Sequence, residues 1–197
     1  MNKSPLLISS LCVAVALLAA TTGAQAQSSY SLYGSGNSYI GLNAGETDFH
    51  LGNGTGLYTA DSHTTAYSLY AGSYFRDSNL GMEVGYTDFG KINRAGGSTK
   101  ADGINLSLIG RLPLGSSFNL LAKVGGLFAH TDVSTAAGSG VTAGSENNLD
   151  LTWGIGAEYA FTRNWSGVVQ YDENTLKFAG GGLDRISNLA LGVRYLY

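Results

Sequence analysis

The stretch that decides the fold runs from Thr65 to Lys91 and reads TAYSLYAGSYF, then RDSN, then LGMEVGYTDFGK. Apolar residues alternate with glycine and small polar residues on both sides of the four-residue polar turn. Alternation with a period of two around such a turn predicts a β-hairpin. Opposite the apolar face of its second half stand glycines, Thr87 and a single charge, Glu83, where a water-facing strand would carry many charges. The pattern favours a face that points into a narrow polar interior.

The same alternation recurs along the rest of the chain and predicts eight strands. Their expected ranges are about 38–48, 65–75, 80–91, 102–112, 118–129, 148–161, 165–173 and 186–197. The expected connections alternate between long and short, with long loops at 50–64, 92–101, 130–147 and 174–184. Strands of about 10–12 residues match a tilted crossing of the hydrocarbon layer, which takes roughly 9–11 residues. The rhythm is that of an antiparallel meander.

Only a closed sheet leaves no unpaired backbone groups in lipid. We therefore predict an all-β fold, an eight-stranded antiparallel up-and-down transmembrane β-barrel, apolar outside and polar within. A soluble lipocalin-type barrel would carry its apolar face inside and a charged face outside, and the few charges here argue against it. Aromatic residues on the apolar face could form the two interfacial girdles: Phe75, Phe118, Phe161, Trp165, Tyr195 and Tyr197 near the short turns, and Tyr67, Tyr86, Phe128, Trp153 and Tyr171 nearer the loops.

The N-terminus carries an export signal. Lys3 precedes an apolar run from Leu6 to Ala20, and Ala24-Gln25-Ala26 is a small-x-small cleavage site. We expect residues 1–26 to be a signal peptide and residues 27–197 to be the barrel domain. The only cysteine, Cys12, lies within the signal. The formal net charge is −3 without a basic block, so a nucleic-acid partner is not expected.

The charged residues on the interior face form the one cluster whose chemistry suggests a candidate functional site. Counted from the short turns, five of them fall in a similar layer of the lumen, with Gln170 and Asn43 near it: Glu83, Arg111, Lys123, Glu158 and Arg194. Two acids and three bases in a narrow space should pair, because buried unpaired charges are costly. The network could plug the lumen and fix strand register, or it could act as a gate. A large open pore is not expected, because side chains fill an eight-stranded interior.

Whole segments of the chain resemble one family. Three segments carry the resemblance: the hairpin at 66–91, the segment Leu151-Thr152-Trp153-Gly154-Ile155-Gly156-Ala157-Glu158-Tyr159 with Asn164-Trp165 and Gln170-Tyr171, and the ending Gly192-Val193-Arg194-Tyr195-Leu196-Tyr197. All three look like strands of the eight-stranded OmpA-type outer-membrane barrels and the allied OmpX group. The resemblance covers essentially the whole mature chain. It implies a Gram-negative outer membrane, with long loops outside the cell, termini in the periplasm and lipopolysaccharide around the barrel.

The resemblance also implies partners in assembly. Periplasmic chaperones would deliver the chain, and the barrel assembly machinery would read the terminal strand, with Tyr195 and Tyr197 as the signal. Tyr197 stands where the family usually ends in Phe. The family implies an interior charge network with Glu83 as its acid and Lys123 or Arg111 as partners. The periplasmic domain with which full-length OmpA proteins grip peptidoglycan is not expected here, so cell-wall tethering is not implied.

Other activities find less support in the residues. Some small barrels modify lipid A with a Ser, His and acid on the outer wall, but His50, His63 and His130 stand at loop edges without a serine two residues later on the same face. We therefore expect no enzyme, no cofactor and no metal site. The expected role is structural, within the envelope. The alternatives are loop-mediated adhesion or resistance to host factors, and a narrow gated porin-like channel.

Overall fold

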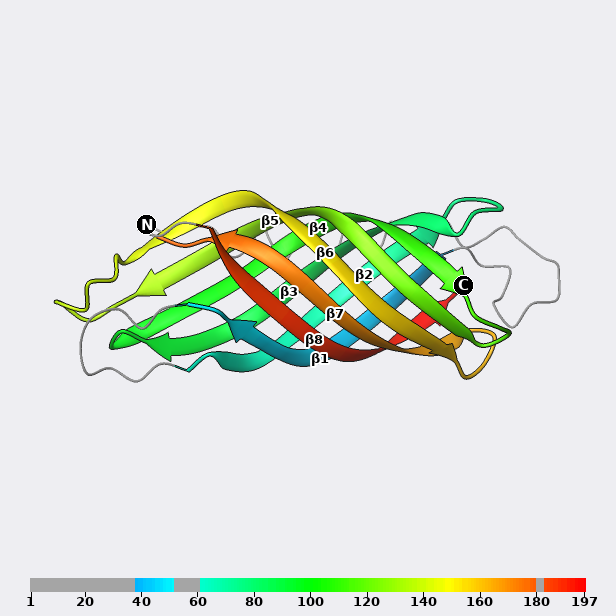
Figure 1. Ribbon diagram of the computed structural model, residues 1–197, viewed down its shortest axis with the longest axis horizontal. Helices are drawn as coiled ribbons and strands as arrows, with labels where there is room; N and C mark the ends of the chain where they lie inside the picture. Colours follow the sequence, from blue (N-terminus) through cyan, green and yellow to red (C-terminus); the bar gives the residue numbers. More distant parts are fainter. Residues whose placement is uncertain (1–37, 52–60, 180–182) are drawn as a thin grey trace.

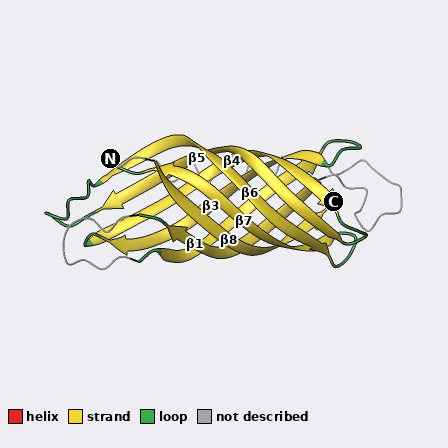
Figure 2. Cartoon of the chain, in the orientation of Figure 1, coloured by secondary structure: helices red, strands yellow, loops and turns green. Residues whose placement is uncertain are grey.

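The computed structural model describes residues 38–51, 61–179 and 183–197. The expected signal peptide at 1–26 lies outside these residues. The described part is all strand, turn and loop (Figure 2). No helix in these three ranges is long and apolar enough to cross a membrane.

Eight antiparallel strands close into one barrel in sequence order, as the alternation predicts. The bounds are β1 Ser38–Phe49, β2 His63–Tyr74, β3 Leu80–Arg94, β4 Gly97–Pro113, β5 Phe118–Ser134, β6 Gly144–Ala160, β7 Trp165–Lys177 and β8 Leu183–Leu196. β1 pairs with β8 from Tyr39↔Leu196 to Phe49↔Ile186, which removes both sheet edges. The short turns and the C-terminal end of β8 lie at one end of the barrel, and the long connections lie at the other (Figure 1).

Three predicted loops are partly strand, and those predictions are wrong. The segment 92–101 is a hairpin whose Arg94↔Gly97 pair encloses Ala95 and Gly96, both with positive φ (50° and 68°). That is the two-residue turn suited to the twist of a hairpin, with alanine in a position that normally takes Asn, Asp or Gly. β5 and β6 extend through half of 130–147, and β7 and β8 extend into 174–184. The connection between β5 and β6 protrudes furthest from the long-loop end (Figure 1, left).

The outer wall is apolar, as predicted. Leu42, Leu106, Ile155 and Leu191 are each more than half exposed in the isolated chain. Apolar side chains in such number on a closed sheet belong in lipid rather than water. Members of both proposed aromatic girdles are also on this wall: Tyr67, Phe75, Phe118, Phe128, Trp153, Phe161, Trp165 and Tyr195.

Candidate functional site: the barrel lumen

Glu83 on β3 lies at the centre of a buried polar network in the short-turn half of the lumen. Its carboxylate accepts a hydrogen bond from the Tyr39 hydroxyl at 2.8 Å. The Nη2 of Arg194 lies 3.6 Å from the same carboxylate, and the Nζ of Lys123 lies 3.7 Å from its other oxygen. Glu83 is only 2% exposed, so both cations act on it with little screening by water.

Glu158 on β6 forms the second anionic centre. Its two oxygens accept hydrogen bonds from Asn119 and Ser166, each at 2.8 Å. The Nη1 of Arg194 lies 3.5 Å from Glu158, while Nη2 of the same side chain faces Glu83. Arg194 therefore bridges two carboxylates that belong to strands on different sides of the barrel.

Three tyrosines from β1 and β2 fill the space around the cations. The guanidinium of Arg194 lies 4.0 Å from the ring centroid of Tyr39 and 5.3 Å from that of Tyr70. Arg111 lies 4.3 Å over the ring of Tyr74, whose centroid is 5.6 Å from that of Tyr39. Arg111 thus reaches the network through the Tyr74 ring, and the face of an aromatic ring attracts a cation by about 0.5–2 kcal/mol.

The sequence analysis missed one acid of the network, Asp172 on β7. It lies 3.1 Å from the Nζ of Lys123 and accepts hydrogen bonds from the side-chain amide of Gln170 at 2.8 and 2.9 Å. Lys123 therefore lies between Asp172 and Glu83. Asp172 stands two residues after Gln170 and shares its inward parity, so the alternation already contained the signal.

An apolar layer fills the lumen above this network, at the long-loop end. The prediction of a polar interior is wrong for this half. Phe49 and Phe178 lie with ring centroids 6.4 Å apart and belong to one cluster with residues from β3, β4, β5, β7 and β8. All are nearly fully buried: Phe49, Phe89, Ile92, Ala101, Leu127, Ala129, Val133, Leu176, Phe178, Ala179 and Ile186. The lumen therefore contains two different fillings in series, one ionic and one hydrophobic.

Close approach of backbone and rings explains several interior glycines. A Cβ at Gly41 would collide with the ring of Tyr70, and one at Gly72 would collide with the ring of Tyr39. The tyrosine rings that fill the lumen thus occupy the space that glycines leave. Gly72 belongs to the deciding hairpin, so this close approach explains the glycine at that position.

The histidines lie at the long-loop rim and face outward. Ser62 Oγ lies 2.8 Å from Nδ1 of His63, and Nε2 of His63 lies 3.5 Å from Asp48 and 3.7 Å from Glu46. His50 lies 3.6 Å from the same Asp48. The side chains of both histidines are 56% exposed, and neither adjoins a described pocket. Within the described ranges, no group of three or more His, Cys, Asp or Glu side chains is placed to hold a metal ion.

The terminal strand closes the barrel. Tyr195 faces outward and packs against Trp165 with a centroid distance of 5.0 Å, and against Tyr197 at 6.5 Å. The backbone N–H of Tyr197 donates to the carbonyl of Ser38 at 3.0 Å, so the last residue is tied to the start of β1.

A closed sheet with an apolar outer wall and a filled lumen defines a small transmembrane β-barrel of the outer-membrane class. The family described as the OmpA-like transmembrane domain matches residues 35–177, and the chain belongs to it. The protein is therefore an OmpA-like barrel of the bacterial outer membrane, as the sequence predicted.

Relatives agree with this assignment. Outer membrane protein A of Yersinia pseudotuberculosis is 28% identical over 82% of this chain and 46% of its own length. The chain spans about half the length of the curated relatives that it matches. Among solved structures, OprG of Pseudomonas aeruginosa has a TM-score of 0.60 at 11% identity, covering 85% of this chain and 99% of OprG. Ail, the attachment invasion locus protein of Yersinia pestis, has a TM-score of 0.54 at 14% identity, covering 82% and 99%.

Proposed function

We propose that the protein is a structural component of the outer membrane whose lumen is a closed plug. The observation that carries this proposal is the two-layer filling, in which Arg194 bridges Glu83 and Glu158 beneath a separate apolar layer. An ion entering from the long-loop end would have to shed its water in the apolar layer, which costs many kcal/mol. A barrel filled in this way adds a rigid wall to the membrane without adding a leak.

The topology of the proposal follows the family. The short turns and both chain termini face the periplasm, and the long connections face outside the cell. Residues 1–26 are removed on export, chaperones escort the chain, and the assembly machinery recognises β8 through Tyr195 and Tyr197. The inter-strand pairing of β8 with β1 supports a decisive role for this strand, because closure depends on it.

The test is deletion of the gene in the bacterium that encodes it, followed by measurement of detergent sensitivity and vesicle release. We expect both to rise and to be restored by the full chain. The refolded protein in planar bilayers should remain electrically silent. Steady conductance of the unaltered barrel would overturn the plug, and an unchanged envelope would overturn the structural role.

Adhesion is the second candidate, and the protruding β4–β5–β6 hairpins favour it. The strands extend well beyond the apolar wall, with polar outward side chains at His130, Asp132 and Ser145. A solved barrel of similar fold is named for attachment and invasion. Replacing residues 135–143 with a short Gly-Ser turn should abolish cell binding while leaving barrel folding intact, if this role holds. Equal binding by the replaced chain would exclude it.

The remaining proposals concern activities. A narrow gated channel would require both lumen layers to open, so it ranks third. An enzyme role is not proposed, because among the described residues the Ser62–His63–Asp48 contacts lie on an exposed rim and line neither of the two hollows found on the outer wall. Hydrolysis assays with outer-membrane lipid and the Ser62→Ala variant would reveal an activity if one exists.

A further inference from the structure

The sheet splits between β6 and β7 at the long-loop end of the barrel. The last cross-strand pair of these two strands is Thr152↔Asn174, although β6 already begins at Gly144. Over residues 144–151, β6 pairs with β5 and with no other strand among the described residues. One side of this stretch is therefore an open sheet edge, which we call the β6 edge (residues 144–151).

β7 does not cover the β6 edge, because the end of β7 turns into the mouth of the barrel. Leu176 and Phe178 belong to the buried apolar layer of the lumen. The carbonyl of Lys177 accepts a hydrogen bond from the hydroxyl of Thr131 on β5 at 2.9 Å. Thr131 is 1% exposed and faces the lumen, so the end of β7 lies on the lumen side of the β5–β6 hairpin rather than beside it.

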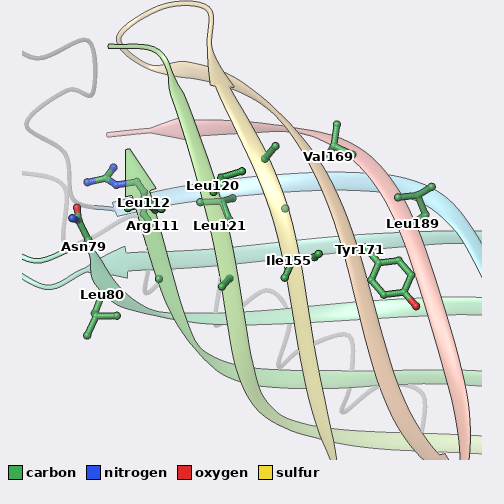
Figure 3. A pocket seen from close by; sticks show the side chains of 14 residues that line it. Asn79, Leu80, Arg111, Leu112, Leu120, Leu121, Ile155, Val169, Tyr171 and Leu189 are labelled. Carbon is green, nitrogen blue, oxygen red and sulfur yellow. The ribbon is translucent and has the colours of Figure 1, made fainter. Parts of the chain in front are cut away.

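Nearer the short turns the same two strands are paired and face lipid. Ile155↔Tyr171 is a cross-strand pair, and both residues line an apolar hollow of about 720 Å³ on the outer wall (Figure 3). Apolar outward side chains continue along β6 as far as Leu149, which is 73% exposed. The next outward residues, Asn147 and Ser145, are polar. The β6 edge therefore begins near the top of the apolar wall and extends beyond it.

The β6 edge presents backbone groups that an added strand could pair. Every second residue of an antiparallel strand directs its N–H and C=O away from a given neighbour, so alternate residues of the edge point theirs away from β5. Such groups are costly to leave unpaired where water is scarce, as beside the apolar side chains of Leu149 and Leu151. Main-chain hydrogen bonds of this kind supply the affinity when a peptide extends a sheet.

The inward side of the β6 edge is acidic. Glu146 and Asp150 stand opposite the lumen-facing Thr131 and Leu127 of β5. Neither carboxylate has a Lys, Arg or His nitrogen within 4.0 Å in the part of the chain that the structure describes. Lys177 acts on Asp150 only from further away. Opposite charges on neighbouring strands attract and like charges repel, so the edge favours a strand with basic residues at alternate positions.

We propose that the β6 edge docks an extended segment of another protein outside the cell. The segment pairs with β6 as an added β-strand and places Lys or Arg beside Glu146 and Asp150. A second copy of this chain fits poorly, because its own edge would bring the same two acids against these. The inference deepens the adhesion candidate, and it rests on the proposed orientation, which places the long connections outside the cell.

Fluorescence anisotropy with the refolded mature chain in a zwitterionic detergent tests the site. The probe is a labelled peptide of alternating lysine and valine. We expect it to bind, and to bind about tenfold more weakly or less when every backbone N–H of the peptide is methylated. Glu146→Gln combined with Asp150→Asn should weaken binding about fivefold. The matched control is Glu173→Gln, an acid on the outward face of the paired part of β7, which should leave binding unchanged.

Hydrogen exchange measured on the same samples locates the peptide. Amides of the β6 edge should exchange more slowly once the peptide is bound, whereas those of the paired segment 165–173 should not change. Unchanged exchange at 144–151, or no binding at all, would overturn the site.

The remaining outcomes separate the parts of the proposal. Equal binding of the methylated peptide would overturn strand pairing, and equal binding by the doubly neutralised variant would overturn the basic partner. Disulfide-linked dimers of an Asn148→Cys variant without peptide would assign the edge to a second copy instead. Urea unfolding of each variant in the same detergent separates loss of the site from loss of the fold. Replacement of 135–143 leaves the β6 edge in place, so the adhesion candidate and this inference can fail independently.

Discussion

Replacing Glu83 by alanine should destabilise the barrel strongly, because the change leaves buried cations behind. Arg194 is 0% exposed and would keep only Glu158 as an ionic partner, at 3.5 Å. Lys123 would keep Asp172 at 3.1 Å, and the Tyr39 hydroxyl would lose its acceptor. Removing one partner of a buried ion pair costs about 3–5 kcal/mol, and most of the cost lies in the stranded charge.

Equilibrium urea unfolding in lipid vesicles measures this cost. We expect the free energy of unfolding to fall by about 3–5 kcal/mol for Glu83→Ala, consistent with a stranded charge. The matched control is Glu173→Ala on β7, which faces outward 3.8 Å from Arg185, itself 74% exposed. Exposed pairs contribute about 0–1 kcal/mol, so this variant should unfold almost as the parent does.

The contrast between the two variants decides the reasoning. If Glu83→Ala costs no more than Glu173→Ala, the lumen is wet enough to solvate Arg194, and the network is not a buried plug. If Glu83→Gln restores most of the loss, hydrogen bonding to Tyr39 rather than charge dominates. Either result would remove the electrostatic argument for closure.

Three further outcomes follow from other parts of the barrel. Gly41→Ala should lower the free energy of unfolding by about 1–3 kcal/mol through overpacking, because the new Cβ would meet the buried ring of Tyr70, whose hydroxyl donates to Asn43 at 3.1 Å. The control is Gly126→Ala, where the new Cβ would lie 3.4 Å from Leu149, and this variant should unfold like the parent. The Glu83→Ala variant alone should show no conductance in planar bilayers, whereas Glu83→Ala combined with Phe49→Ser in the apolar layer should show discrete openings. Openings from Glu83→Ala alone would mean that the charge network, and not the apolar layer, is the barrier to ions. Burial lowers the pKa of His130, but the Asn147 hydrogen bond and the Asp132 charge outweigh it and raise the pKa overall. Its contribution to stability is therefore complete below the ordinary histidine pKa and lost as pH rises through the raised value, and His130→Ala should flatten that slope in pH-dependent unfolding.

The sequence predicts the fold well where apolar residues alternate with small ones. The hairpin at 65–91 and the terminal strand at 186–197 show this pattern, and the structure pairs them as expected. Prediction fails where both faces are apolar, where the apolar face turns inward, and where the outer face is polar. Leu127 faces the lumen beside the outward Phe128, whereas Phe49, Phe89 and Ile186 face the lumen between polar or glycine neighbours, so alternation alone does not reveal which face is inner.

The polar strand ends fail for the opposite reason. Asp132 and Ser145 extend the outer face of the sheet beyond the membrane, where water replaces lipid and an apolar outer face has no cause. The turn at Ala95 is not predicted from the sequence, because alanine is not a residue that indicates a positive φ. Parity could locate Asp172, but distances within the lumen depend on strand tilt, which the sequence does not contain.

Both tryptophans of the chain, Trp153 and Trp165, face outward, and the aromatic rings of the ionic layer are tyrosines instead. Tryptophan fluorescence will therefore report contact of the outer wall with lipid and will not report packing inside the barrel. Trp165 lies near the short turns, and Trp153 lies further from them on β6. Quenchers placed at different bilayer depths will therefore measure when each of these two parts of the outer wall inserts into the membrane.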